Sequence, residues 1–438
     1  MPISLLLLRA PEHPHESAEP CPFLNFVPFI RLRQLANQPF TGSRAEMEPI
    51  VTTSLGRVRF AATVRRARTA PGMLNAKKKR KVTFFLPGFE SAPVGGYRVV
   101  YEYANHLART ENYSVQIVHS RALILSAKKK YFKWTYLRSL KSALRGNFSM
   151  RPGRPIRWFH LDKGVSVSFT ASRPRVRPRH GDVLIATAAQ TAPFVAAAVG
   201  DTGATGIYFI QSYETWSMPV EFVDSTWRLP LRRLAVAPWL VDLGASLGVE
   251  VTLVSNAIDS GEFEEGGNLE SRERSVLALV SPAPLKRTDL VVSVYNSVKA
   301  IDPSVSLTTF GTCERPAGLP PETVHLQDPP RDLLAATYRA TRVYLCASDI
   351  EGWGLPPAEA LMSGTSVVST DNGGVRSYAS EAAVFSPIGS AQGLLDNVML
   401  MLTNTDLAQK LTDHGNHTLR AYGPVAAAQK FEIEISRP

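Results

Sequence analysis

Short apolar runs rich in β-branched and aromatic residues alternate with amphipathic helical segments along most of this chain of 438 residues. In the first half, the pattern predicts a helix at 97–109 and strands at 81–87, 114–120, 156–161, 182–187, 205–211 and 249–255. In the second half, it predicts strands at 276–282, 306–311, 342–348 and 365–371, and helices at 288–301, 331–340 and 356–364. Strands that alternate with helices form a parallel sheet whose two faces are both covered.

The alternation starts afresh after a polar stretch, so the sequence predicts two domains. The fold class is α/β, with two Rossmann-like, doubly wound parallel sheets. We expect an N-terminal domain at 77–257, a linker at 258–274, a C-terminal domain at 275–420 and a tail or helix at 421–438. Ligands of such sheets bind beyond the carboxyl ends of the strands, so two facing sheets would share one cleft.

Residues 1–76 are rich in Pro, Arg, Ser and Thr and show no sustained periodicity. We expect them to be disordered. Because Met73 directly precedes the first strand, an over-extended gene start is the alternative.

Composition narrows the class of protein. No run of 18 apolar residues occurs, so we expect no transmembrane helix. The opening residues make a poor signal peptide, and the three cysteines have no metal or disulfide spacing. The sequence therefore indicates a cytoplasmic protein with reduced thiols.

Positive charge is concentrated in one part of the chain. Residues 73–180 carry 23 Lys and Arg against four Asp and Glu, whereas residues 181–438 carry 17 against 29. Within the basic part, the segment 127–145 has six basic residues after position 128 and an apolar face of Phe132, Tyr136, Leu140 and Leu144. This pattern suits peripheral contact with the anionic inner face of the plasma membrane, or with a lipid-linked acceptor. An ordinary surface helix is the alternative.

The string EGWGLPPAEAL at 351–361 places two glutamates eight positions apart, separated by two glycines, a tryptophan that we expect to be exposed, and two prolines. Gly352 and Gly354 allow a sharp turn close to a ligand. The prolines suit the first turn of a helix, so we expect Glu359 in that turn. The free N–H groups of the helix could bind a diphosphate, and the two carboxylates could bind sugar hydroxyls. Without a ligand role, Glu359 would only complement the helix dipole and Glu351 would be a solvated acid.

The string and the following residues, up to the NGG at 372–374, closely resemble the signature of the retaining, nucleotide-sugar-dependent glycosyltransferases of the GT-B fold, family 4. The resemblance covers roughly residues 80–425 and implies that Glu359 binds ribose and Glu351 the donor sugar. It also implies that backbone N–H groups of Gly354 and Leu355, together with Gly352, lie against the donor. A nucleoside diphosphate sugar would then be the donor substrate, with no metal or other cofactor.

Other positions follow from the same resemblance. Lys286 and Arg287 lie where the family has the basic pair that holds the diphosphate, although the usual Gly-Arg of the family is Ser281-Pro282 here. Such cations stabilise the charge that develops on the leaving diphosphate. The string GFESAPVGGYR resembles the glycine loop of the first domain, with Gly95 and Gly96 near the diphosphate or the acceptor; a simple turn is the alternative.

A histidine found in many members of this family is absent from the string IYFIQSYETWSMP, which offers Gln211 and Glu214 instead. The QxYE string is similar to that of a rhamnosyltransferase-like sub-group. Gln211 or Glu214 could orient the acceptor or stabilise an oxocarbenium-like transition state. His119 and His160 are possible cleft residues; a structural role is the alternative.

These observations predict a retaining glycosyltransferase of hexosyl or rhamnosyl type that acts on a carbohydrate or lipid-linked acceptor in cell-envelope glycan synthesis. A nucleotide-sugar epimerase of the same fold is the first alternative. A polyanion- or nucleic-acid-binding protein is the second, although no nucleic-acid-reading module is recognisable and we expect no nucleic-acid partner.

Overall fold

The computed structural model describes residues 79–124 and 156–437. Contacts separate residues 1–73 from residues 74–438, and only the second unit contains described residues. The expected disordered extension at 1–76 and the basic helix at 127–145 therefore lie outside the described residues. No helix in the described ranges is long and apolar enough to cross a membrane.

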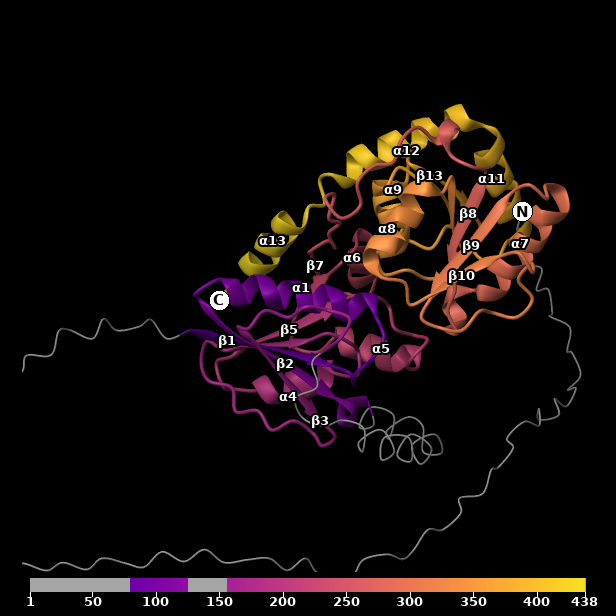
Figure 1. Ribbon diagram of the computed structural model, residues 1–438. Coiled ribbons are helices and arrows are strands. Elements are labelled where there is room, and N and C mark those ends of the chain that lie inside the picture. The colour runs from indigo at the N-terminus through magenta and orange to yellow at the C-terminus, as the bar shows by residue number, and fades with distance from the viewer. Residues whose placement is uncertain (1–78, 125–155, 438) are drawn as a thin grey trace, which may run out of the picture. The chain divides into compact units, whose positions relative to one another are not determined.

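The first half of the described chain forms a parallel seven-stranded sheet, here called the N-terminal sheet (Figure 1), in the order β3-β2-β1-β4-β5-β6-β7. Its strands are β1 (Arg80–Leu86), β2 (Tyr113–Ser120), β3 (Val165–Thr170), β4 (Val183–Ala186), β5 (Thr205–Ile210), β6 (Arg232–Ala235) and β7 (Thr252–Leu253). Its helices are α1 (Gly95–Arg109), α4 (Ala192–Val199), α5 (Val220–Trp227) and α6 (Pro238–Ser246).

The second half forms a parallel six-stranded sheet, the C-terminal sheet, in the order β10-β9-β8-β11-β12-β13. Its strands are β8 (Ser275–Leu279), β9 (Ser306–Gly311), β10 (Val324–Gln327), β11 (Val343–Cys346), β12 (Ser366–Thr370) and β13 (Ala383–Ser386). The helices are α7 (Thr288–Ile301), α8 (Arg331–Ala340), α9 (Leu355–Met362), α10 (Arg376–Ala379), α11 (Ala391–Thr403), α12 (Thr405–Leu419) and α13 (Pro424–Ser436). Two short 3-10 helices, η1 (Leu269–Ser271) and η2 (Pro284–Lys286), flank β8.

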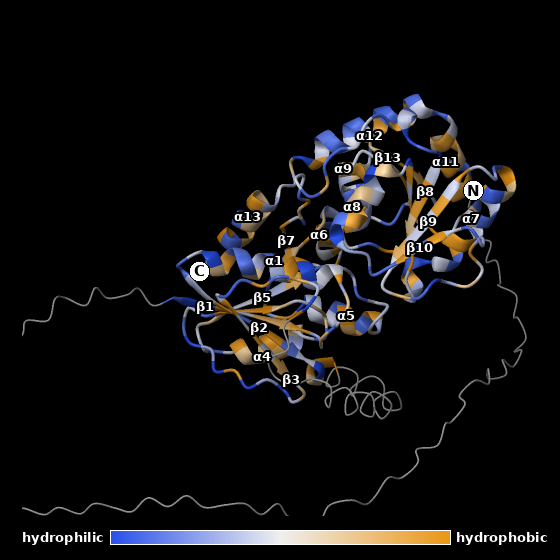
Figure 2. Ribbon diagram, viewed as in Figure 1, coloured by the Kyte–Doolittle hydropathy of each residue, from blue (hydrophilic) through white to orange (hydrophobic). Residues whose placement is uncertain are grey.

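This architecture confirms the expected fold of two doubly wound parallel sheets. Central strands of such sheets are covered on both faces and are therefore apolar along their length. Accordingly β11 and β12 are buried at every position, and Figure 2 shows hydrophobic residues along β8 and β9. Each sheet reverses its strand order once, between β1 and β4 and between β8 and β11, and ligands bind at such reversals.

The last helix, α13, packs on the N-terminal sheet beside α1, although it follows the helices of the C-terminal sheet in the chain (Figure 1). Phe431 stacks on Tyr103 of α1 with ring centroids 4.2 Å apart. The Arg80 guanidinium donates to the Ile435 carbonyl at 3.0 Å. The chain end thus ties the second half back to the first.

Two predictions in the first half are wrong. Residues 156–161 form no strand, because Trp158 and Phe159 pack their rings against Tyr101 at 5.4 and 5.3 Å and Asn105 binds the backbone of His160. The strand beside β2 is β3 instead. The strand predicted at 249–255 shortens to the two residues of β7 at the sheet edge.

Candidate active site

Lys286 and Glu351 meet at the reversal of the C-terminal sheet. Lys286 ends η2 after β8, and Glu351 follows β11, the neighbour of β8. The Lys286 ammonium lies 2.5 Å from Glu351 Oε1, and the Ser348 hydroxyl donates to the same oxygen at 2.7 Å. The Glu351 side chain is only 10% exposed and that of Lys286 21%. Because the parallel strands end at one edge, this pair projects where a ligand of the sheet would bind.

Arg287, the other candidate cation, points to different partners. It has a left-handed backbone (φ 49°) and forms ion pairs with Asp289 at 2.7 Å and with Asp349 at 3.1 Å. These two carboxylates already balance its charge. The structure therefore brings Lys286, and not Arg287, into contact with Glu351.

The glycines after Glu351 allow the backbone to pack tightly. A Cβ on Gly352 would lie 1.8 Å from the Gln211 carbonyl oxygen. The Trp239 indole N–H donates to the Gly352 carbonyl at 2.8 Å. Gly354 has φ 92° and begins α9 as its N-cap. This loop of the C-terminal sheet is thus fixed against two residues that follow strands of the N-terminal sheet.

Gly95 and Gly96 open α1 opposite this loop. A Cβ on Gly96 would lie 3.2 Å from Gln211 Oε1, and one on Gly95 would lie 3.5 Å from the Leu355 side chain. The structure therefore gathers Gly95, Gly96, Gln211, Gly352 and Leu355. The first N–H groups of α1 have no intrahelical acceptor, as at every helix N-terminus, and such groups suit a phosphate.

Glu359 lies in the second turn of α9, one turn later than predicted, because the helix begins at Leu355. It is buried, with 5% exposure. Its Oε1 accepts from the Arg331 guanidinium at 2.9 Å and its Oε2 from the Tyr338 hydroxyl at 3.1 Å. The carboxylate predicted to be free for ribose is thus already held by two partners.

Arg331 continues this contact toward the N-terminal sheet. It pairs with Glu262 through bonds of 2.7 and 2.9 Å, and Glu262 pairs with Arg98 of α1 at 3.0 Å. A cavity of about 370 Å³ is lined by these side chains together with Glu359 and Leu355. This series of ion pairs connects Glu359, a candidate ligand residue, to α1.

Glu214 faces the start of α4. Its Oε2 accepts from the Ala189 N–H at 2.9 Å, in the loop after β4. Burial raises the pKa of the Glu214 carboxyl to about 7, although the Ala189 hydrogen bond lowers it in part. At neutral pH this carboxyl can therefore accept or donate a proton, a property that candidate acid–base residues share.

The titration of Glu214 should make the stability of the protein depend on pH. The folded pKa lies above the ordinary value of 4.5, so the folded protein keeps a proton that the unfolded chain releases between about pH 4.5 and 7. The free energy of unfolding falls as the pH rises through this window. We expect Glu214→Gln to remove on the order of 2–3 kcal/mol of this dependence, measured by urea unfolding at pH 5 and pH 8. Exposed Glu264→Gln should leave it unchanged; equal pH dependence in both variants would contradict the assignment.

His119 and His160 lie outside this arrangement. His119 is 1% exposed, its Nδ1 lies 2.8 Å from the Gly88 carbonyl and its Nε2 lies 3.2 Å from the Tyr101 hydroxyl. Burial lowers the pKa of His119 to about 4. The His160 side chain is 90% exposed. The contacts of His119 are those of a buried residue inside the N-terminal half, whereas the His160 side chain is exposed.

Four residues of the candidate site were not predicted from the sequence: Ser348, Trp239, Arg331 and Tyr338. Ser348 could have been noticed, because it precedes Glu351 by three positions in one loop. Trp239 lies in α6, and Arg331 and Tyr338 both lie in α8. Within residues 79–124 and 156–437, no group of three His, Cys, Asp or Glu side chains is placed to hold a metal ion.

The residues around this site match a known protein family. Residues 270–418 match the family model described as "Glycosyl transferases group 1". This matched segment lies in the C-terminal half of the chain. It contains Lys286, Glu351 and Glu359. No curated protein sequence matches the chain.

Solved structures share the fold of both halves. The sucrose-phosphate synthase of Thermosynechococcus elongatus has a TM-score of 0.63 at 14% identity, over 81% of this chain and 98% of that chain. Anabaena HepE in complex with UDP-glucose has a TM-score of 0.58 at 12% identity, over 81% and 99%. An S. aureus TarM mutant in complex with fondaparinux, alpha-GlcNAc-glycerol and UDP has a TM-score of 0.56 at 11% identity, over 82% and 100%. At these identities the likeness shows the fold alone, and it agrees with a GT-B fold for the two halves of this chain.

Proposed function

We propose that this protein is a retaining glycosyltransferase that moves a sugar from a nucleoside diphosphate to a carbohydrate or lipid-linked acceptor. The observation that carries the proposal is the Lys286–Glu351 pair at the strand-order reversal of a group 1 domain. Lys286 would neutralise the diphosphate as the glycosidic bond breaks, and Glu351 would hold the sugar hydroxyls.

The residues of the N-terminal sheet would complete the reaction centre. Gly95 and Gly96 place the N-terminus of α1 beside Leu355, where its N–H groups could bind the leaving phosphate. Gln211 and Glu214 would lie on the acceptor side. Retention follows from the family resemblance, in which the departing phosphate oxygen takes the acceptor proton. No protein base is then required.

The identity of the donor and the cellular role of the protein are also proposals. HepE and TarM were solved with UDP or UDP-glucose, which supports a uridine nucleotide here. A rhamnosyltransferase-like donor, a role in cell-envelope glycan synthesis, and a cytoplasmic position at the inner face of the membrane rest on the sequence alone. We expect no metal requirement.

A nucleotide-binding experiment tests the donor site. UDP, GDP, dTDP, ADP and CDP are each added to wild type and to Glu359→Gln, and the melting temperature is measured. A ligand at 100 times its Kd stabilises the fold by about 2.7 kcal/mol, so one nucleotide should raise the melting temperature clearly. Glu359→Gln removes the charge of a carboxylate that would accept bonds from the ribose. It should therefore weaken the binding of that nucleotide by roughly tenfold, or about 1.4 kcal/mol.

Exposed Glu264→Gln serves as the control and should respond like wild type. No shift with any nucleotide would overturn the donor-site assignment. Release of the nucleoside diphosphate from its sugar, measured with and without an added glycan acceptor, separates transfer from the epimerase alternative, which needs no acceptor.

A further inference from the structure

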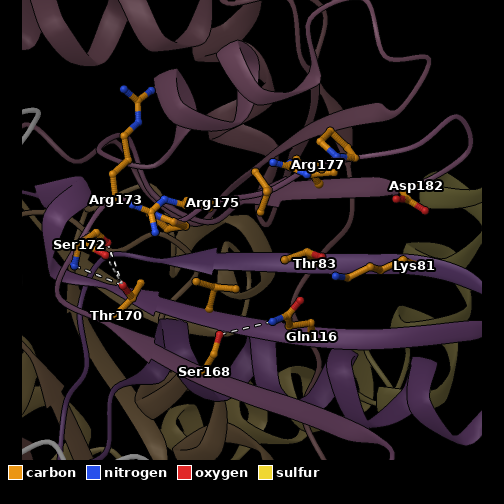
Figure 3. A pocket seen from close by; sticks show the side chains of 15 residues that line it. Lys81, Thr83, Gln116, Ser168, Thr170, Ser172, Arg173, Arg175, Arg177 and Asp182 are labelled. Atoms are coloured by element: carbon orange, nitrogen blue, oxygen red, sulfur yellow. Dashed lines mark hydrogen bonds between the residues drawn. The ribbon is translucent and has the colours of Figure 1, made fainter.

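A second cavity, of about 400 Å³, lies on one face of the N-terminal sheet (Figure 3). Its floor is formed by side chains of β1, β2, β3 and β4, and its cover by residues 172–178, here called the arginine strap. Lys286 and Glu351 follow β8 and β11 of the C-terminal sheet, and none of the residues that line this cavity lines the cavity beside Glu359. The cavity is therefore distinct from the candidate active site.

The floor of this cavity is unusual for a parallel sheet, whose faces are normally apolar. Thr83, Gln116, Ser168 and Thr170 present hydroxyl and amide groups to it. Thr83 and Gln116 are direct neighbours across β1 and β2. Thr83 is only 3% exposed, and its side chain lines the cavity.

The arginine strap alternates in chemistry. Pro174, Val176 and Pro178 are half-buried, whereas Arg173, Arg175 and Arg177 are exposed. The prolines fix their own φ angles and so limit the conformations of the strap. The structure places the strap over the face of the sheet (Figure 3).

The charge of the cavity is not balanced by the described residues. Lys81, Arg175 and Arg177 form no ion pair within residues 79–124 and 156–437. Arg173 lies over the Phe194 ring at 5.4 Å. Asp182 is the one acid among the described lining residues, and it accepts from the Arg179 backbone N–H at 2.9 Å. Basic groups over hydroxyl and amide groups suit a ligand that carries both negative charge and free hydroxyls.

We propose that this cavity binds an anionic sugar, one that carries a phosphate, sulfate or carboxylate group beside free hydroxyls. The arginine strap and Lys81 would bind the anionic group, and Thr83, Gln116 and the β3 hydroxyls would bind the sugar. The volume is within the range of small-molecule sites. The occupant is either a free sugar phosphate or the charged end of a glycan chain, because both offer this chemistry.

Isothermal titration calorimetry tests this proposal with four probes: glucose 6-phosphate, glucuronate, glucose and inorganic phosphate. Wild type should bind glucose 6-phosphate at least tenfold more tightly than either glucose or inorganic phosphate. The double variant Arg175→Gln/Arg177→Gln should weaken the binding of glucose 6-phosphate at least tenfold. Thr83→Val should weaken the binding of glucose 6-phosphate several-fold and leave the binding of inorganic phosphate unchanged.

Arg179→Gln is the matched control, because Arg179 is exposed next to the strap but does not line the cavity. Equal losses of glucose 6-phosphate affinity in Arg179→Gln and in the double variant would show general electrostatic attraction and overturn the proposal. Absence of binding in wild type would also overturn it. A uronate-containing tetrasaccharide that binds more tightly than glucuronate identifies a glycan chain as the occupant; equal binding identifies a small sugar.

The test does not depend on the proposed transferase function. Glu359→Gln should weaken nucleotide binding and leave glucose 6-phosphate binding unchanged. The arginine-strap variants should weaken glucose 6-phosphate binding and leave nucleotide binding unchanged. A failure at one cavity is therefore distinguishable from a failure at the other.

Discussion

Lys286→Met is expected to lower kcat for sugar transfer by about 10²–10³, the usual cost of removing one preorganised group from the charge that develops in a transition state. The methionine keeps the apolar stem of lysine and removes only the ammonium that lies 2.5 Å from Glu351. The Km for the donor should change less than kcat, because the diphosphate gains charge chiefly as the glycosidic bond breaks. Steady-state kinetics with sugar conjugates of the nucleoside diphosphate that stabilises wild type measures both constants.

Stability must be separated from catalysis in this variant. Lys286→Met leaves the Glu351 carboxylate buried without its cation, and breaking such a pair can cost about 3–5 kcal/mol. The double variant Lys286→Met/Glu351→Gln removes both charges, so we expect it to regain stability and to stay inactive. Lys299→Met is the matched control. Lys299 is also an ion-paired lysine of this half, 3.1 Å from Glu322, and it lies outside the site. A folded Lys286→Met protein with wild-type kcat would remove Lys286 from the mechanism.

The fold of the second half could be predicted because its pattern is strong. The bounds of α7, β9 and α8 agree with the sequence prediction, and α7 and α8 each have one clear apolar face. The end of α9 was also predictable. Gly364 has φ 73°, and the Thr365 N–H donates back to the Ala360 carbonyl, as in a Schellman cap.

The first half was less predictable because two of its strands are polar. The strand β3 reads VSVSFT and β6 begins with two arginines, so neither forms an apolar run. Aromatic residues that pack outside a sheet resemble a strand in sequence, as at Trp158 and Phe159. Local patterns do not reveal which apolar run joins a sheet, because tertiary packing decides it.

The candidate site was predictable in its loops and not in its contacts between distant segments. Lys286 and Glu351 follow neighbouring strands, so topology alone brings them together. The Arg331–Glu359 pair joins two helices 28 positions apart, and nothing in either segment indicates it. Trp353, expected to be exposed, is 2% exposed and packs on Tyr378 at 4.6 Å. It supports the loop from inside instead of contacting a ligand.

Gly352→Ala is expected to lower kcat/Km at least about 100-fold, although it adds a single methyl group. The new Cβ would lie 1.8 Å from the Gln211 carbonyl oxygen, a backbone atom that no side-chain rotation can move away. The loop must shift, and the Trp239 bond to the Gly352 carbonyl must lengthen or break. Displacement of about 1 Å at a reacting centre can cost 10² in rate. The overpacking should also lower the free energy of unfolding by roughly 1–3 kcal/mol.

The control for this variant is Gly423→Ala, where a Cβ would meet nothing within 4 Å and φ is −67°. Its kinetics and its unfolding midpoint should stay close to those of wild type. If Gly352→Ala kept full activity, the loop could not be packed on Gln211 while the reaction takes place. Glu351 and Gln211 would then belong to separate surfaces, and the donor and acceptor sides would have to be assigned independently. Loss of activity in Gly352→Ala, with the nucleotide-induced shift in melting temperature retained, would place the defect at the junction of the two halves and leave the donor pocket intact.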